Sequence, residues 1–310
     1  MPAPFPENGR PAARFPARSL VLGPVAAALA GIALFSVMDA LMKRASLVGG
    51  VYSALLARSL IGAALLTPVW RLRGGRMPGW PVLRLHAARG LLAAGMAATF
   101  FWGLVRMPMA QAMALSFIAP LIALWLAAAL LGEKVRRAAI LAALLGIAGV
   151  AVIAAARLRG AEHTPAAGWG IAAILCSAVL YAANLVLQRR QAQLAAPVEV
   201  ALFQNGVVAL ALMPAFPILW RTPDMAALRD IAGAAVMASA ALMLLAFAYA
   251  RREAQTLVPI EYTAFGWAAL AGWTWFGEAV TPATLAGLVL ILGGVWLGTR
   301  NGASGAAAPG

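Results

Sequence analysis

Residues 257–278 constrain this chain more than any other stretch, because they form a run of 22 mostly apolar residues that carries a carboxylate near its start. As a helix rising 1.5 Å per residue, the run would be about 33 Å long, enough to cross a bilayer. Glu261 lies two residues after the helix-breaking Pro259. A charged side chain inside hydrocarbon costs about 2.5–3.5 kcal/mol, and a proline frees backbone groups that need other partners. The pattern therefore predicts a helix that lines a polar cavity rather than a plain membrane anchor.

Composition extends this conclusion to the whole chain. Hydrophobic residues make up 63% of the sequence, charged residues only 11%, and the mean hydropathy is +0.87. These charges are too few to cover the surface of a soluble protein of 310 residues. The net charge of +14 would favour nucleic-acid binding in a soluble domain. Here the basic residues lie in short segments between apolar runs, as in membrane proteins, so we expect no nucleic-acid partner.

The apolar runs predict an all-α integral membrane protein with ten transmembrane helices. The runs end at charges, glycines or prolines, and their lengths suit bilayer spans. The ten predicted spans are residues 20–42, 51–70, 88–105, 109–131, 138–156, 168–188, 198–220, 231–250, 254–276 and 282–299.

The distribution of lysine and arginine predicts the orientation. With the N-terminus inside, sixteen of the 24 basic residues fall in inner segments and seven in outer loops, while Arg58 lies within a span. Because cytoplasmic loops are enriched in lysine and arginine, we expect a multi-pass protein of a bacterial-type cytoplasmic (inner) membrane with both termini in the cytoplasm. Residues 1–19 contain prolines and arginines and are predicted to be a disordered cytoplasmic tail. A signal peptide is the alternative, but the first run is longer than a signal-peptide core.

The two halves of the chain repeat. The matches are Ala110-Gln111 with Ala254-Gln255, Gly132-Glu133 with Gly277-Glu278, and Gly149 with Gly294, at offsets of 144, 145 and 145 residues. Five spans is an odd number, so the second copy must enter the membrane from the opposite side. We therefore predict two inverted-topology five-helix repeats, residues 20–156 and 168–299, with a connector at 157–167 and a flexible tail at 300–310. Inverted repeats are typical of alternating-access carriers.

The sequence resembles the drug/metabolite transporter superfamily, in particular ten-helix transporters of the EamA type. The similarity covers the chain from about Leu22 to Thr299. It is carried by residues 38–43 (MDALMK), 58–60 (RSL), 116–120 (SFIAP) with 132–133 (GE), and 259–263 (PIEYT) with 276–278 (FGE). The resemblance implies two five-helix repeats and transport of a small metabolite or drug. The Glu-Tyr-Thr stretch is also similar to a branch that includes importers of S-adenosylmethionine and riboflavin.

Glu261 is the first candidate functional residue. It is expected to bind a cationic or hydrogen-bonding group of the substrate, or to take up a proton and so couple transport to a proton gradient. The structural alternative is that Glu261 caps backbone freed by Pro259 or pairs with an arginine.

Asp39 and Arg58 are the second candidates. They lie at similar depth in the first and second spans, so they are predicted to form a buried pair or to contact substrate. Removing either member of a buried pair is expected to lower the free energy of unfolding by about 3–5 kcal/mol, whether the pair is structural or contacts substrate.

Aromatic and amide side chains within the spans suit a ligand with both apolar and polar parts, although each is also explained by helix packing. The predicted substrate-binding set adds Trp102, Gln111, Phe117, Tyr181, Asn184, Gln204, Asn205 and Tyr262. Pro120 and Pro259 are predicted as gating hinges, with static kinks as the alternative. Glu133 and Glu278, beside glycines at span ends, are expected to be caps or interface anchors.

These features predict a secondary transporter that moves a small organic solute by alternating access, with import and export both open. The solute classes considered are amino-acid-like, nucleoside-like and drug-like. The alternatives are a membrane-embedded enzyme, a lipid-handling protein and a channel. The sequence shows no metal-ligand cluster, no phosphate-binding loop and no nucleophile triad placed within the spans, so we expect no enzyme activity, no cofactor and no metal. The expected partners are a small-molecule substrate and the lipid bilayer, with a homodimer left open.

Overall fold

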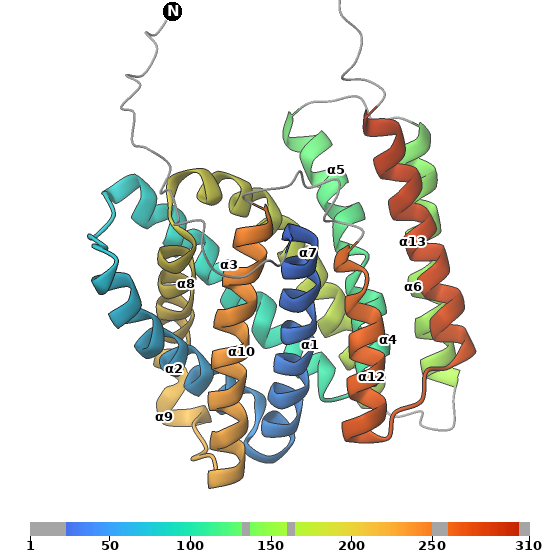
Figure 1. The fold of residues 1–310 in the computed structure, drawn as a ribbon. Coiled ribbons are helices and arrows are strands. Elements are labelled where there is room, and N and C mark those ends of the chain that lie inside the picture. Colours follow the sequence, from blue (N-terminus) through green and yellow to red (C-terminus); the bar gives the residue numbers. More distant parts are fainter. Residues whose placement is uncertain (1–22, 132–136, 160–164, 250–259, 304–310) are drawn as a thin grey trace, which may run out of the picture.

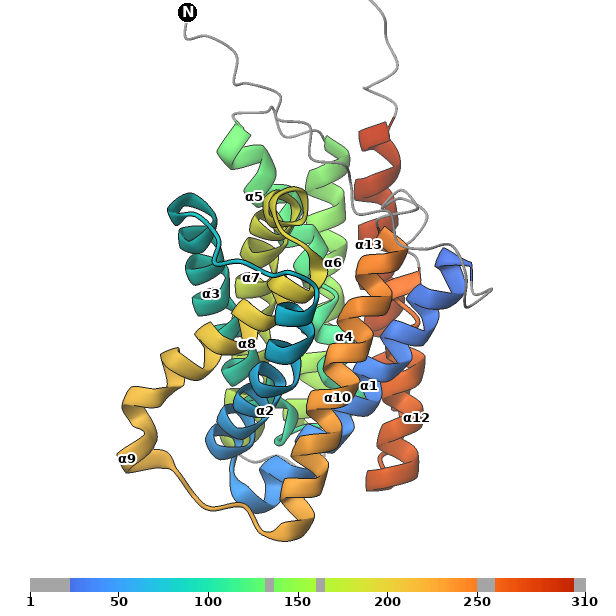
Figure 2. The same cartoon turned by 60° about the vertical axis from the view of Figure 1, so that its left-hand side comes forward.

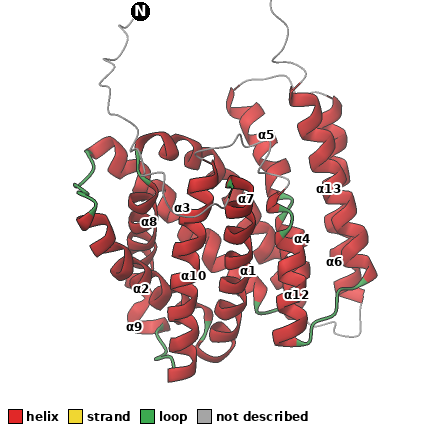
Figure 3. Cartoon of the chain, viewed as in Figure 1, coloured by secondary structure: helices red, strands yellow, loops and turns green. Residues whose placement is uncertain are grey.

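The structure, a computed structural model, describes residues 23–131, 137–159, 165–249 and 260–303, and the regular elements in these residues are helices (Figures 1 and 3). The first half contains α1 (Pro24–Gly49), α2 (Val51–Leu72), α3 (Trp80–Leu104), α4 (Met109–Ser116), α5 (Ala119–Leu131) and α6 (Arg137–Arg159). The second half contains α7 (Pro165–Leu194), α8 (Pro197–Leu212), the 3-10 turn η1 (Met213–Ala215), α9 (Phe216–Leu219), α10 (Met225–Tyr249), α12 (Ala264–Phe276) and α13 (Pro282–Ala303).

The helices confirm the all-α membrane architecture. Within the described residues, seven helices are long and apolar enough to cross a membrane, and they correspond to predicted spans one to three and five to eight. Spans four and ten contain the shorter apolar helices Met109–Ala123 and Pro282–Leu297. Span nine includes α12, but its first part falls within residues 250–259, outside the described residues. The count of ten spans therefore stays a prediction.

Several boundaries differ from the sequence-based expectation. The third helix begins at Trp80 rather than at residue 88, because Gly79 and Pro81 start it early. The seventh span ends its regular helix at Leu212, since Pro214 and Pro217 interrupt the following turns. Helix α6 runs to Arg159 and α7 starts at Pro165, so the predicted connector at 157–167 is partly helical, as is the start of the predicted tail at 300–310. The tail predicted at residues 1–19 lies outside the described residues.

The helices pack as two oppositely directed copies. In Figure 1, α1 begins at the upper end of the bundle and α13 finishes there, whereas α7 begins at the lower end. The packing partners are exchanged accordingly: α1 lies mainly on α10, and its counterpart α7 lies mainly on α3. Helices α2 and α8 pack on each other, as do α6 and α13, so each of these pairs joins equivalent helices of the two repeats. This arrangement is the inverted repeat that the sequence predicts.

The pair α6–α13 forms one flank of the bundle in Figure 1, and the turned view of Figure 2 brings the opposite side, with α2 and α8, forward. Its helices approach closely because glycines face each other. A Cβ on Gly149 would lie 2.5 Å from the Gly287 carbonyl oxygen, and a Cβ on Gly287 would lie 2.6 Å from the Gly149 oxygen. A Cβ on Gly294 would lie 2.6 Å from the Ala142 oxygen. Small residues thus allow the backbone contact that drives helix association in lipid.

Both long spans are broken at equivalent positions. Helix α4 ends at Ser116 and α5 starts at Ala119, so the break falls at Phe117 and Ile118. In the second repeat the break is the turn at Tyr262 and Thr263 that precedes α12. The two breaks are separated by 145 residues, the offset of the sequence repeat. Phe117 and Tyr262 at the breaks pack in the central core, which also contains the fully buried side chains of Leu104, Leu115 and Ile174.

Candidate functional site

The breaks of the two repeats meet at the centre of the bundle. The rings of Phe117 and Tyr262 contact each other edge to face, with centroids 5.1 Å apart and planes at 88°. The Tyr262 hydroxyl is buried and has no hydrogen-bond partner in the described part of the chain. A buried polar atom without a partner costs stability, so it is a candidate for contact with a ligand or with water. Two predicted site residues are therefore brought together at the interface of the repeats.

Glu261 and Tyr181 join this centre from two helices. Glu261 is half-buried just before the break, and Tyr181 lies on α7. The Tyr181 hydroxyl interacts electrostatically with Glu261 and with Tyr262. An acid and two phenols, all from the second repeat, thus lie within electrostatic range of each other. The substrate-binding and proton-coupling roles of Glu261 stay predictions.

Asp39 and Arg58 form a second polar region on α1 and α2. Asp39 is 7% exposed, and the two charges interact, although they do not approach within 4.0 Å as a salt bridge. Arg58 instead donates from Nη1 to Met38 Sδ at 3.6 Å and lies 5.8 Å from the centroid of the Phe101 ring. Its Nε is buried without a partner among the described residues. The predicted pair is thus an electrostatic interaction without a direct hydrogen bond between the two side chains.

The amide candidates lie in different places. Gln111 is buried on α4, and Gln204 on α8 has a buried Oε1 that no described donor contacts. Asn205 donates to the Ala201 carbonyl of its own helix, 2.9 Å away, and packs against Gly62 of α2. Its observed contacts are therefore those of helix packing.

Trp102 and the prolines complete the predicted set. Trp102 is 36% exposed on α3, and its ring stacks under Arg106 at 3.4 Å, so it does not join the central group. Pro120 lies in the first turn of α5, directly after the break in the first repeat. Pro259 is outside the described residues. At the offset of 145, Pro120 corresponds to Phe265, so the two prolines flank the breaks from opposite sides rather than occupying equivalent positions.

The sequence reasoning missed a buried polar chain on α3, α7 and α8. Arg89 Nε donates to Asn184 Oδ1 at 3.1 Å, and Arg89 Nη1 donates to Gln191 Oε1. Gln191 Nε2 lies 2.6 Å from His86 Nδ1, and His86 Nε2 lies 3.2 Å from Glu199 Oε1. The sequence contained a signal: with a helix from Trp80, residues 86, 89, 93, 97, 101 and 104 share one buried face.

A second buried group joins the two repeats at the lower end of the bundle. Lys43 Nζ on α1 donates to the Met107 carbonyl oxygen at 2.8 Å and forms an ion pair with Glu278 Oε1. Glu278 Oε2 accepts from the backbone N–H of Met109, the first residue of α4, at 2.7 Å. Gly277 ends α12 with φ +65°, and this turn places Glu278 beside the start of α4. It is thus the cap and interface anchor that the sequence predicts, whereas Glu133 lies outside the described residues.

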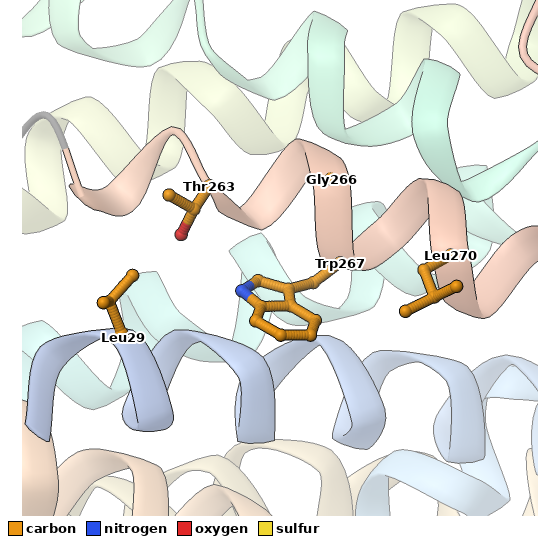
Figure 4. A pocket seen from close by; sticks show the side chains of 5 residues that line it. All are labelled: Leu29, Thr263, Gly266, Trp267 and Leu270. Atoms are coloured by element: carbon orange, nitrogen blue, oxygen red, sulfur yellow. The ribbon is translucent and has the colours of Figure 1, made fainter. Parts of the chain in front are cut away.

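An apolar groove runs between α1 and α12 (Figure 4). Its wider part has a volume of about 440 Å³ and is lined by Leu29, Thr263, Gly266, Trp267 and Leu270. In Figure 4, Thr263 and Trp267 project from α12 toward α1. The groove begins two residues after Glu261, so an opening lies beside the broken part of span nine. In the described part of the chain, no three metal-ligating side chains come together.

Comparisons with known proteins agree with this architecture. The family model described as the EamA-like transporter family matches residues 22–155 and again residues 168–300. The pseudopaline exporter CntI of Pseudomonas aeruginosa is 26% identical over 264 residues, which cover 83% of this chain and 89% of that protein. The probable terminal-alkyne amino-acid exporter of Streptantibioticus cattleyicolor is 28% identical over 255 residues, 82% of this chain and 84% of that protein.

A solved crystal structure has a similar fold. Its TM-score is 0.59 at 24% sequence identity, and the match covers 90% of this chain and 96% of the solved chain. At this identity the similarity concerns the fold alone.

Proposed function

Because the chain belongs to the EamA-like transporter family, we propose that it is a secondary carrier that exports a small amino-acid-like metabolite by alternating access. Membership of this family already makes the chain a multi-pass membrane transporter of the drug/metabolite superfamily. What we propose beyond that is the direction of transport and the class of solute. They are supported by the names of the two relatives, an exporter of pseudopaline and a probable exporter of an amino acid. These names favour export over the importer branch that the Glu-Tyr-Thr stretch resembles.

The observation that carries the proposal is the meeting of two helix breaks between oppositely directed repeats. Phe117 and Tyr262 occupy equivalent positions and contact each other. Irregular backbone at membrane depth is tolerated where it lines a cavity, and inverted repeats place substrate sites at their interface. A rocking motion of one repeat against the other would expose these residues first to one side and then to the other.

The ion pair of Lys43 with Glu278 supports a gate at one end. It connects α1 of the first repeat with the end of α12 in the second repeat and also holds the start of α4. At the offset of 145, the residues that correspond to Lys43 and Glu278 in the sequence are Gln188 and Glu133, so the counterpart of Lys43 is uncharged.

Glu261 is proposed as the coupling group. A carboxyl that neighbours Tyr181 and Tyr262 can bind an ammonium group or exchange a proton as the site changes sides. Transport would then be driven by the proton gradient or by the gradient of the solute alone. The predicted inner segments are rich in basic residues. This supports a protein of the inner membrane with both termini in the cytoplasm. The homodimer stays a prediction.

The test is solute movement in proteoliposomes. Vesicles containing the purified protein are loaded with labelled amino acids, and efflux is followed with and without unlabelled solute outside. A carrier shows saturable efflux that external solute accelerates. Glu261→Gln is expected to abolish or uncouple this exchange, whereas Asp224→Asn, at an exposed carboxylate that caps α10, should leave it unchanged. Flux that does not saturate would indicate a channel, and chemical change of the solute would indicate an enzyme.

A further inference from the structure

Arg89 is a buried cation whose hydrogen-bond partners are neutral. It lies on α3 with 4% of its surface exposed, and its bonds go to the amide oxygens of Asn184 and Gln191. A guanidinium stays charged in proteins, and burying a charge is costly unless an opposite charge offsets it. The amides solvate Arg89 but do not neutralise it. The nearest carboxylate along the hydrogen-bonded chain is that of Glu199, on the far side of Gln191 and His86.

The chain of bonds fixes the orientation of the guanidinium. Asn184 holds Nε, Gln191 holds Nη1, and Gln191 is held in turn by His86, whose ring stacks on Phe203 with centroids 4.6 Å apart. Nη2 of Arg89 makes no hydrogen bond to any described residue, and this atom is not completely buried. One edge of the fork is therefore tied down, and the other remains available.

Arg89 lies beside the central region, because Asn184, which bonds it, is one helical turn from Tyr181 on α7. Tyr181 and Tyr262 pack against the same apolar cluster. Arg89 interacts electrostatically with Tyr181, which also interacts with Glu261 and Tyr262. A fixed cation and an anion thus flank Tyr181, next to the apolar contact of Phe117 with Tyr262. This order of groups is complementary to a zwitterion that carries a carboxylate, an ammonium and an apolar side chain.

We infer that Arg89 binds the carboxylate of the transported solute, an inference that rests on the proposed export of an amino-acid-like metabolite. The planar guanidinium matches a carboxylate in shape and charge and supplies the opposite charge that its buried position lacks. Asn184 and Gln191 act as positioning residues that hold the fork. The solutes accepted by the carrier therefore require a free carboxylate, and the amides of the same amino acids are poor ligands.

The experiment measures binding to purified full-length protein in detergent. The common amino acids are screened by thermal shift, and the affinity of the tightest binder is compared with that of its own carboxamide. The wild-type protein is expected to prefer the amino acid by roughly 10- to 100-fold, the range that a charged hydrogen bond provides. Arg89→Gln should lose this preference, because it weakens binding of the amino acid and leaves binding of the carboxamide within about twofold, since an uncharged amide group does not pair with the guanidinium charge.

Matched variants separate this effect from a structural one. Arg84→Gln removes an exposed arginine from the same helix and should keep the wild-type preference. Asn184→Ala, which deletes one bond to Arg89, should lower the preference without reaching that of Arg89→Gln. If Arg89→Gln does not fold, Arg89→Lys gives the same test, because lysine keeps the charge but loses the fork and should lower the preference.

Each result that would contradict the role of Arg89, the carboxylate site or the proposed substrate class can be told apart from the others. A folded Arg89→Gln or Arg89→Lys variant with the wild-type preference would overturn the role of Arg89. Equal binding of the amino acid and its carboxamide by the wild type would overturn the carboxylate site and leave the exporter proposal standing. If no amino acid binds and a solute of another class does, both the proposed substrate class and the inference are wrong.

Discussion

Neutralising Glu278 should destabilise the protein strongly, because it leaves Lys43 as a buried charge without its partner. The side chains of Lys43 and Glu278 are 6% and 16% exposed, so water does little to screen them. Removing one member of a buried pair costs about 3–5 kcal/mol. Glu278→Gln keeps an acceptor for the Met109 N–H, so the loss reports the charge pair rather than the helix cap. At about 2–4 °C per kcal/mol, the apparent Tm in detergent should fall by on the order of 10 °C.

The neighbouring pair provides the control. Arg44 also forms an ion pair, with Asp230, but the Arg44 side chain is 54% exposed and that of Asp230 is 10% exposed. Asp230→Asn leaves only the half-exposed Arg44 charge without its partner, where water can solvate it, so the Tm should fall by at most a few degrees. The double variant Lys43→Met with Glu278→Gln removes both buried charges and should recover most of the lost stability, since an apolar replacement of a buried pair is often neutral. A Tm for Glu278→Gln no lower than that for Asp230→Asn, or a double variant no more stable than the single one, would refute this reasoning.

Three further predictions concern packing and the centre. Gly149→Ala should lower stability by about 1–3 kcal/mol, because the new Cβ meets a backbone carbonyl of α13. Gly266→Ala, with nothing within 4 Å of the new Cβ, should instead raise stability by up to about 1 kcal/mol. A similar Tm for the two variants would contradict the close approach of α6 and α13. Tyr262→Phe removes a buried hydroxyl without a described partner, so stability should hold or rise while solute affinity falls; unchanged affinity would exclude the hydroxyl from the site. Exchanging the charges of Asp39 and Arg58 should restore folded protein relative to either single charge reversal, and transport measured in that variant decides between a structural pair and substrate contact.

Much of the fold could be predicted because lipid imposes simple rules. Apolar length locates the spans, and the odd number of spans in each repeat forces inversion, which the exchanged packing of α1 on α10 and α7 on α3 confirms. The break in span four was also predictable, since Pro120 cannot continue a regular helix. The exact positions of the breaks were not, because they coincide with the tertiary contact of Phe117 and Tyr262 rather than with the prolines.

The candidate site was harder to predict because basic residues near a span have two interpretations. The predicted third span, residues 88–105, leaves His86 outside the membrane and Arg89 at its edge, yet α3 begins at Trp80 and buries both. Conversely, Trp102 lies within a span but faces outward, because residues 101 and 104 occupy the buried face of the helix. Lys43 and Glu278 each end a span, and only the fold brings them together across 235 positions of sequence.

The most direct test of alternating access is the reactivity of one cysteine at the centre. Ser116 is half-buried and corresponds to Glu261 in the other repeat, at the offset of 145. Ser116→Cys, made in a Cys176→Ala background, is placed in sealed vesicles, and a membrane-impermeant thiol reagent is added to one side at a time. We predict labelling from either side, with saturating solute reducing both rates. Labelling from one side only, whatever the solute concentration, or from neither side, would contradict a central site that opens alternately to the two compartments.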